Sequence, residues 1–269
     1  MTLFRAAGYD VTNSPLLQRL RGAQTGRSTL RIFRILASLL FILAVPVALV
    51  TTNIRWVANE DRVYVYAIDQ YNGVQTTGVD REELLRGGSE LREFFRNDAD
   101  TFDIRVMQND REISLFNPRE TTHLEDVKDR FQEMNTAQEF SVLYIVAYIA
   151  IVVLWAREVT VRRLAVQTAL GCLVLLATVG IVGAIGLSGF DSAWTEFHKI
   201  IFSNDFWLLN PTTDRLIQMF PPAFWESIVF FIGLMIIAET ALVLIAVGIY
   251  LGASGHHDRA RRRLEPEYA

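Results

Sequence analysis

The sequence predicts a mainly α-helical integral membrane protein with four transmembrane helices and a small α+β extracytoplasmic cap. Three observations predict this class. Of the 269 residues, 51% are hydrophobic and 21% are charged, which is too apolar for an ordinary soluble domain. The apolar residues are gathered into four blocks, each close to the roughly 20 residues that a helix needs to cross a bilayer. Lys and Arg are concentrated in alternate segments between these blocks.

The four apolar blocks are residues 35–54, 140–156, 164–187 and 228–251. Helices are expected because a lipid-exposed span must satisfy its own backbone hydrogen bonds. The short segment 157–163 separates the second and third blocks, so these spans are predicted to form a tight helical hairpin. A cleaved signal peptide in place of the first span is disfavoured, since the basic leader is long and no small-x-small cleavage site follows.

The distribution of basic residues predicts the orientation. Residues 1–34 hold six Arg and one acidic residue, residues 157–163 hold three Arg and one Glu, and residues 252–269 hold four Arg and three acidic residues. Residues 55–139 hold 11 basic and 19 acidic residues, and residues 188–227 hold two basic and five acidic residues. Because basic segments resist translocation, both termini and the turn are predicted to be cytoplasmic. The cap (residues 55–139) and the 188–227 segment should be extracytoplasmic.

The charge and the cysteine content exclude other classes. The net charge is only −4, which argues against nucleic acid as a partner. The single cysteine, Cys172, lies inside an apolar block, so no internal disulfide can form and a packing role is expected.

The first part of the cap is predicted to contain a strand, a helix and a hairpin. Val and Tyr side chains alternate along residues 62–69, which is typical of a strand. Residues 80–95 are predicted to form a helix capped by Asp80, despite a pair of glycines within it. Two short apolar runs flank Asn109 and Asp110, which is a hairpin pattern.

A second cap helix is expected from residue 121 to residue 134. Thr122 and Glu125 have the spacing of a capping box, and an apolar stripe follows at helical spacing: Leu124, Val127 and Phe131. His123 would lie in the first turn, where the helix dipole favours the neutral imidazole that a general base needs. A solvent-exposed or capping histidine is the alternative interpretation.

The 188–227 segment is rich in aromatic residues, with nine Phe and Trp residues among the 36 between residues 190 and 225. Such a density beside a membrane is typical of rings at the headgroup level. Large apolar residues at helical spacing predict an amphipathic interfacial helix that contains His198: Phe190, Trp194, Phe197 and Ile201.

Each extracytoplasmic segment therefore contains one histidine, while His256 and His257 lie in the basic tail. If the cap sits on the interfacial helix, His123 and His198 can meet at the membrane surface. A metal site is the rival interpretation. Zinc sites use three or four ligands, and Asp126 is the only further ligand in view, so no metal is expected.

Two stretches of the chain resemble one family of bacterial membrane proteins, the lipoprotein intramolecular transacylases. They are LFNPRETTHLEDV at residues 115–127 and FHKIIFSNDFWLLNPTTDRLI at residues 197–217, supported by TGVDREEL at residues 77–84. The likeness covers most of the chain from about residue 34 to residue 251. The chain departs from the family pattern in its longer basic N-terminus, in its tail and at Leu124, where Met is expected.

The resemblance implies a transferase of the bacterial plasma membrane that needs no cofactor. It would move the sn-2 acyl chain of a diacylglyceryl lipoprotein onto the α-amine of the N-terminal cysteine, giving the lyso form. In that family two histidines at the junction of cap and membrane are catalytic, and they correspond to His123 and His198. The chemistry suits them, because proton removal from the amine and proton delivery to the leaving oxygen can be shared by two imidazoles. His123 is predicted to be the base and His198 the assisting group, with the reverse left open.

Six further residues are candidates for supporting or substrate-orienting roles: Arg119, Asn117, Asp126, Trp207, Asn210 and Asp214. Arg119 is predicted either to orient a headgroup or carbonyl or to form a salt bridge with Glu120, Glu125 or Asp126.

The other candidates are expected to act locally. Asn117 should organise the loop before its helix, and Asp126 should either fix the tautomer of His123 or solvate the helix. Asn210 and Asp214 are expected to cap a short helix at residues 213–220.

Glu239, in the fourth apolar block, supports a second interpretation. A carboxylate in lipid is costly and often functional, for example as a proton relay in a small proton-coupled transporter or ligand sensor. A protonated Glu239 hydrogen-bonded to another helix is at least as well supported, and the chain shows no inverted repeat. A non-catalytic subunit whose cap recruits envelope proteins is the third interpretation.

Overall fold

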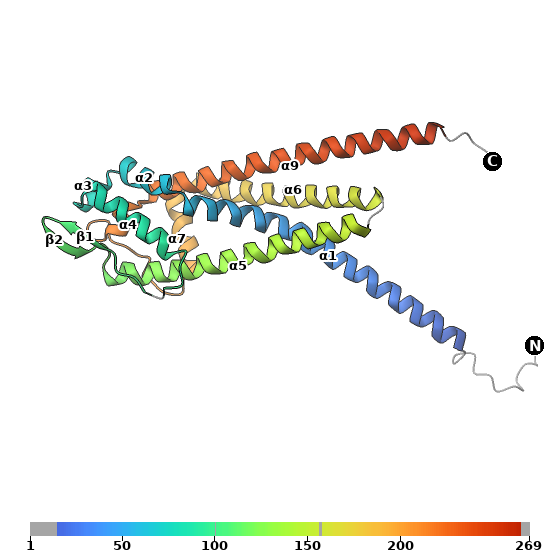
Figure 1. Cartoon of the computed structure of the whole chain (residues 1–269), viewed down its shortest axis with the longest axis horizontal. Helices are drawn as coiled ribbons and strands as arrows, with labels where there is room; N and C mark the ends of the chain where they lie inside the picture. Colours follow the sequence, from blue (N-terminus) through green and yellow to red (C-terminus); the bar gives the residue numbers. More distant parts are fainter. Residues whose placement is uncertain (1–14, 100, 156–157, 265–269) are drawn as a thin grey trace, which may run out of the picture.

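The computed structural model describes residues 15–99, 101–155 and 158–264. Four long helices run side by side: α1 (Pro15–Asn59), α5 (Pro118–Trp155), α6 (Glu158–Ser188) and α9 (Pro222–Leu264) (Figure 1). Each contains a stretch that is long and apolar enough to cross a membrane, and α1 packs against the other three. The prediction of four membrane-spanning helices is therefore confirmed. The turn predicted at residues 157–163 is shorter, because α6 already begins at Glu158.

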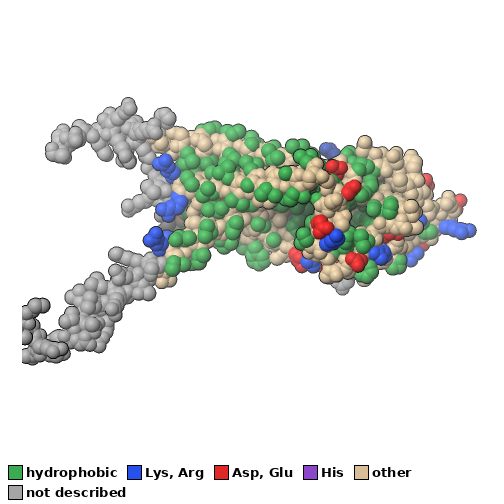
Figure 2. Space-filling model, turned by 180° about the vertical axis from the view of Figure 1, so that it is seen from behind, with side chains coloured by type: hydrophobic (Ala, Val, Ile, Leu, Met, Phe, Trp, Pro, Cys, Tyr) green, Lys and Arg blue, Asp and Glu red, His purple; other side chains and the backbone are tan. Residues whose placement is uncertain are grey.

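An apolar belt surrounds the four helices. On the face shown in Figure 2, hydrophobic side chains cover the bundle between a group of Lys and Arg at one end and a mixed charged region at the other. Large hydrophobic side chains are exposed all along these helices, as at Leu43 (57%), Leu154 (76%) and Leu234 (66%). A continuous exposed apolar surface of this size fits lipid and not water. The chain is a multi-pass membrane protein.

Helix α5 is much longer than the membrane is thick. The predicted cap helix at 121–134 and the predicted span at 140–156 are one unbroken helix of 38 residues, about 57 Å long. Nine charged residues lie between residues 119 and 139, and none lies between residues 140 and 154. The apolar part of α5 is therefore residues 140–154, and the charged N-terminal half extends beyond it.

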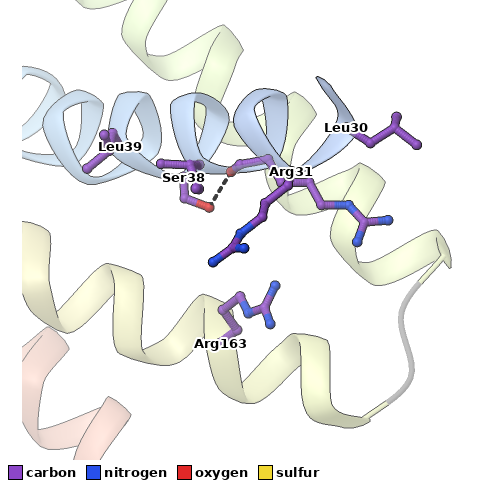
Figure 3. Close-up of a pocket in the computed structure, with 7 residues that line it drawn as sticks. Leu30, Arg31, Ser38, Leu39 and Arg163 are labelled. Atoms are coloured by element: carbon purple, nitrogen blue, oxygen red, sulfur yellow. Dashed lines mark hydrogen bonds between the residues drawn. The ribbon is translucent and has the colours of Figure 1, made fainter. Parts of the chain in front are cut away.

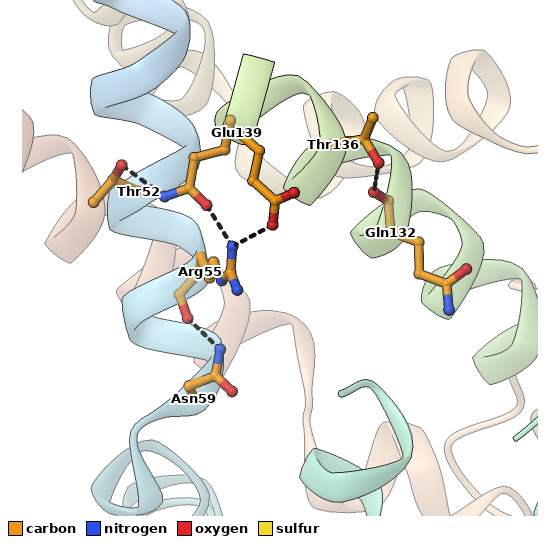
Figure 4. Close-up of polar contacts among 7 residues, drawn as sticks. Thr52, Arg55, Asn59, Gln132, Thr136 and Glu139 are labelled. Carbon is orange, nitrogen blue, oxygen red and sulfur yellow. Dashed lines mark hydrogen bonds and ion pairs between the residues drawn. The ribbon is translucent and has the colours of Figure 1, made fainter. Parts of the chain in front are cut away.

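Polar contacts join α1 to α5 just beyond this apolar part (Figure 4). Arg55 of α1 donates to Gln138 Oε1 at 2.8 Å and forms an ion pair with Glu139 at 3.5 Å. Gln138 Nε2 in turn donates to Thr52 Oγ1 at 2.8 Å. Because these pairs require one axial position of the two helices, they fix how far α5 extends beyond the bundle.

Short elements pack around the end of the bundle at which α5 begins (Figure 1). They are α2 (Asp61–Gln70), α3 (Gly73–Thr77), α4 (Arg81–Phe94), β1 (Arg105–Gln108), β2 (Arg111–Ser114), α7 (Phe190–Ile201) and α8 (Arg215–Met219). Helix α4 follows Asp80, and α7 has the predicted bounds of the interfacial helix. Strands β1 and β2 pair antiparallel around Asn109 and Asp110, whose φ angles of 53° and 61° suit a two-residue hairpin turn. The two helices and the hairpin are confirmed, but the predicted capping of α4 by the Asp80 side chain is wrong, because this side chain makes no hydrogen bond to the helix.

The strand predicted at residues 62–69 is wrong, because these residues form helix α2. Tyr64, Ala67 and Ile68 are buried at helical spacing, whereas a strand would bury every second side chain. The strand preference of Val and Tyr reflects packing on a sheet surface, whereas α2 packs mainly against helices α3 and α4. The Tyr64 ring instead packs against Phe220, with centroids 6.1 Å apart.

The cap has no independent core. Its buried side chains form one cluster with residues of α8 and of the start of α9: Leu216, Met219, Phe220, Phe224 and Ile228. A segment of the cap's size buries little apolar surface by itself, so these later residues supply what it lacks. Gly87 lets α4 approach the cluster, because a Cβ atom there would lie 2.6 Å from Leu115 Cδ2.

Two residues singled out within the apolar blocks have structural partners. Glu239 of α9 accepts a hydrogen bond from Asn53 Nδ2 of α1 at 2.7 Å, which is the interhelical bond expected from one of its two interpretations. Cys172 is fully buried between Phe41 and Val45, so its predicted packing role is confirmed.

A close contact between α1 and α6 gives a first prediction. A Cβ atom at Gly171 would lie 2.9 Å from Ile42 O and 3.1 Å from Val45 Cβ. We expect Gly171→Ala to lower the melting temperature of the purified protein, since the displaced backbone costs about 1–3 kcal/mol. Gly180→Ala on the same helix is the control, because no heavy atom lies within 4 Å of its Cβ position. Equal melting temperatures for the two variants would contradict this packing.

Candidate active site

The N-terminus of α5 is fixed by a capping box. Asn117 Oδ1 accepts hydrogen bonds from Arg119 N at 2.9 Å and Glu120 N at 3.0 Å, and Glu120 Oε2 accepts one from Asn117 N at 2.7 Å. Pro118 occupies the first helical position, where a missing N–H is tolerated. The role expected for Asn117 is confirmed. The capping box predicted at Thr122 is wrong, because this earlier cap starts the helix sooner.

Glu120 also caps a second helix. Its side chain is 1% exposed, and its Oε1 accepts a hydrogen bond from Leu216 N, in the first turn of α8, at 2.5 Å. Burial raises the pKa of the Glu120 carboxyl, while the two backbone N–H donors act in the opposite direction. One buried carboxyl group thus ties the start of α5 to the start of α8.

Asp214 and Asn210 stabilise the loop before α8. Asp214 accepts hydrogen bonds from Asn210 N at 2.7 Å and from Asn117 Nδ2 at 3.1 Å, and Asn210 Oδ1 accepts one from Thr212 N at 3.0 Å. Asp214 precedes α8 but makes no side-chain bond to it. The predicted capping of this helix by Asn210 and Asp214 is therefore wrong, because Glu120 already binds the Leu216 N–H.

His123 lies one turn after Glu120, in the second turn of α5. The sequence placed it in the first turn, but the helix begins three residues earlier than predicted. The side chain is buried, and its Nδ1 has no hydrogen-bond partner among the described residues. Burial, and secondarily the neighbouring His198, lower the pKa of His123 from 6.5 to about 4. The imidazole is therefore neutral at physiological pH.

Helix α7 brings His198 against His123, with the ring centroids 6.0 Å apart. The two histidines meet, as the sequence predicted. His198 Nδ1 donates a hydrogen bond to the carbonyl oxygen of Trp194 at 2.7 Å, so Nδ1 holds the proton and Nε2 keeps its lone pair. Burial lowers the pKa of His198, and the Trp194 carbonyl partly offsets this effect.

Aromatic rings enclose the histidine pair. The Phe202 ring lies 5.1 Å from His123, and the rings of Trp194 and Trp207 lie 4.8 Å and 5.1 Å from His198. Trp207 Nε1 is buried and, like His123 Nδ1, has no partner within the described part of the chain. Buried polar atoms without partners are rare in folded proteins, and a bound ligand commonly satisfies them. The arrangement therefore suits a substrate with hydrogen-bond acceptors inside an apolar enclosure.

Arg119 and Asp126 both bind the loop that follows α7. Arg119 donates to the backbone oxygen of Asp205 and lies 5.9 Å from the Phe206 ring, and Asp126 accepts a hydrogen bond from Asn204 Nδ2 at 2.9 Å. In the described structure Arg119 forms none of the ion pairs proposed from the sequence. Asp126 likewise makes no bond to His123. Neither partner lies near these residues in the sequence, which is why local spacing did not reveal them.

Sequence reasoning missed two residues that shape the site, Glu120 and Asn204. Glu120 had been considered only as an ion-pair partner of Arg119, although the Asn-Pro-x-Glu spacing that starts at Asn117 is a capping signal. No local pattern marks Asn204.

Among the residues that the structure describes, no group of three or more His, Cys, Asp or Glu side chains could hold a metal ion.

Comparison with known proteins decides the family. The family model described as lipoprotein intramolecular transacylase Lit matches residues 39–225. The chain belongs to this family. As a Lit family member it is a membrane transferase, a transacylase that acts in lipoprotein modification, and the resemblance seen in its motifs is confirmed.

Solved Lit structures from Bacillus cereus share the fold. One is 18% identical with a TM-score of 0.62, and the match covers 82% of this chain and 97% of that chain. Structures of two variants, in which a histidine is replaced by arginine or by alanine, are 16% identical with TM-scores of 0.66. They match 86% of this chain and 99% of their own. No curated protein sequence matches the chain.

The double capping by Glu120 gives a second prediction. Glu120→Ala leaves the buried N–H of Leu216 and the half-buried N–H of Asn117 without acceptors, so we expect it to destabilise the protein by about 2–4 kcal/mol. The melting temperature of the purified protein measures this loss. Asp129→Ala removes an exposed carboxylate from the same helix and should leave the melting temperature unchanged. A Glu120→Ala variant as stable as Asp129→Ala would show that the carboxyl group does not hold the two helices together.

The burial of His123 gives a third prediction. Its folded pKa of about 4 lies below the ordinary 6.5, so between these values the unfolded chain binds a proton that the folded chain does not. This contribution to stability is complete above pH 6.5 and is lost as the pH falls toward 4. In histidine-labelled protein, the NMR signal that is missing from His123→Ala should keep its neutral chemical shift down to about pH 5. A titration midpoint near 6.5 would show that the ring is not buried.

Proposed function

We propose that the protein transfers the sn-2 acyl chain of a diacylglyceryl lipoprotein to the α-amine of that lipoprotein's own N-terminal cysteine. One observation carries the proposal: two buried imidazoles with lowered pKa values lie 6.0 Å apart inside an aromatic enclosure. The family supplies the reaction class and the lipoprotein substrate. The histidine pair supplies the groups that such a transfer requires.

The transfer exchanges one bond for another within a single molecule. The amine nitrogen attacks the ester carbonyl, the new C–N bond forms, and the C–O bond to the glyceryl oxygen breaks. A proton leaves the nitrogen, and a proton is delivered to the departing oxygen. Both reacting groups belong to the substrate, so an enclosure that folds the lipidated cysteine accelerates the reaction by proximity.

We assign the base to His198 and the hydrogen-bond donor to His123, which reverses the roles preferred from the sequence. His198 Nε2 is free to accept the amine proton because Nδ1–H is held by the Trp194 carbonyl, and that bond stabilises the imidazolium that forms. His123, with a pKa of about 4, is a weak base, but its neutral ring keeps an N–H that can donate to the developing oxyanion.

Aromatic residues support the same chemistry. Trp207 Nε1–H is a second buried donor without a partner among the described residues, and in this proposal it binds the substrate carbonyl or the leaving oxygen. The rings of Trp194, Phe202 and Trp207 exclude water, which would otherwise hydrolyse the ester. Arg119 and Asn117 act by positioning the loop and helix that line the enclosure.

The proposal also includes the orientation of the protein in the membrane. The excess of basic residues in segments 1–34, 157–163 and 252–269 supports cytoplasmic termini and a cytoplasmic turn. The histidine pair then lies on the extracytoplasmic side, where the cap meets the aromatic helix α7.

The reaction can be read directly from a reporter lipoprotein. In cells that lack other N-acylating activity, wild-type protein should move one acyl chain of the reporter's N-terminal peptide from the glycerol to the α-amine, as detected by mass spectrometry. His123→Ala and His198→Ala, expressed to matched levels, should each lower the product by roughly 100-fold or more. His256→Ala, in the basic tail, is the control and should have no effect. Full activity in both site variants would remove the histidines from the mechanism.

Glutamine at each position separates the two roles. His123→Gln keeps a neutral N–H donor, so part of the activity should remain. His198→Gln cannot accept the amine proton, so its product should fall as far as in His198→Ala. Retained activity in His198→Gln together with complete loss in His123→Gln would restore the opposite assignment.

A further inference from the structure

A pocket lies at the end of the bundle opposite the cap, between α1 and α6. Its volume is about 660 Å³, and it is lined by Arg163 of α6 and by six residues of α1: Leu30, Arg31, Arg34, Ile35, Ser38 and Leu39. We propose that this pocket binds the phosphate headgroup of an anionic phospholipid. The proposal does not depend on the transacylase reaction, because the pocket is remote from α7 and its histidine (Figure 1).

Charge is the first argument. Three guanidinium groups line the pocket, from Arg31, Arg34 and Arg163, and no acidic side chain is among the lining residues. Figure 3 shows arginine side chains on the facing sides of α1 and α6. Within the described structure, none of the three has an ion pair. Arg31 and Arg34 are also one turn apart, a spacing at which like charges destabilise a helix.

An anion removes this repulsion. Guanidinium groups bind phosphate oxygens through charge-assisted, often paired hydrogen bonds, and three of them around one space provide more donors than one phosphate can use. Ser38 Oγ is already bonded to the Arg34 carbonyl oxygen at 2.8 Å, so the arginines remain the principal donors. The chemistry therefore specifies a phosphate ester or an inorganic phosphate.

The apolar side chains of the pocket favour a phospholipid over a free phosphate. Leu30, Ile35 and Leu39 line the same pocket and are 60%, 49% and 51% exposed. They begin the apolar belt of α1, so the arginines lie at the boundary where headgroups meet acyl chains. A free phosphate would leave these side chains uncovered, whereas a phospholipid covers them with its acyl chains while its phosphate meets the arginines.

Native mass spectrometry of the full chain tests this proposal. After incorporation into nanodiscs of equimolar phosphatidylglycerol and phosphatidylcholine, wild-type protein should retain phosphatidylglycerol in at least about tenfold preference. The triple variant Arg31→Gln, Arg34→Gln and Arg163→Gln should lose this preference. Arg163→Lys keeps the charge and should retain most of it.

The matched control is the triple variant Arg261→Gln, Arg262→Gln and Arg263→Gln, which removes the same charge from the tail. If this variant loses the preference as fully as the pocket variant, the arginines act only through net charge, and the site is overturned. An unchanged preference in the pocket variant overturns it as well. Melting temperatures of all variants in detergent identify any that fail to fold, and the single variant Arg163→Gln, which should lower the preference, then carries the comparison with wild type.

A second measurement distinguishes the two sources of phosphate. In phosphatidylcholine bicelles, adding phosphatidylglycerol should raise the melting temperature of wild type more than that of the pocket variant. Inorganic phosphate alone should not raise it. An equal rise with inorganic phosphate would assign the pocket to a soluble anion and overturn the lipid proposal.

Discussion

The geometry of the site depends on one buried carboxyl group, that of Glu120. A carboxyl group excluded from water is tolerated only where its oxygens find donors, and here the backbone N–H groups of Asn117 and Leu216 provide them. These two residues belong to helices that are far apart in the chain. The requirement therefore fixes α5, with His123 one turn on, against α8 and the loop that contains Trp207. A single desolvated group thus ties the start of α5, which carries His123, to the start of α8.

The two histidines are held by different means. His123 belongs to α5, a continuous helix whose other half spans the membrane and is locked to α1 through Arg55 and Gln138. His198 belongs to the short helix α7, which stacks on α9 through Trp194 and Trp225, with centroids 5.2 Å apart. Because α1, α5 and α9 are parts of the same bundle, the separation of the imidazoles is set by the packing of the membrane helices.

Features with a local or periodic signal could be predicted from the sequence. The apolar blocks, the hairpin at Asn109 and the helix after Asp80 follow from composition and spacing, whereas the pairing of the two histidines was implied by the family resemblance. The prediction of a strand at residues 62–69 was wrong, because these residues form helix α2 and their side chains pack against other helices. The partners of Arg119 and Asp126 lie in a distant loop, and tertiary contacts between remote segments leave no mark on local spacing. Glu120 had a signal in its capping motif, but its second helix could be found only in three dimensions.

The shared core of the cap has a consequence for biosynthesis. Ribosomes deliver the chain from its N-terminus, so the cap residues emerge long before Met219, Phe220 and Phe224 are available to complete their core. The carboxyl group of Glu120 likewise cannot accept its second hydrogen bond until Leu216 has been synthesised. An interrupted chain that ends before α8 contains His123 and His198 but lacks the segments that hold them together. The core of the cap and the double capping by Glu120 are therefore completed only when α8 and the start of α9 have been synthesised.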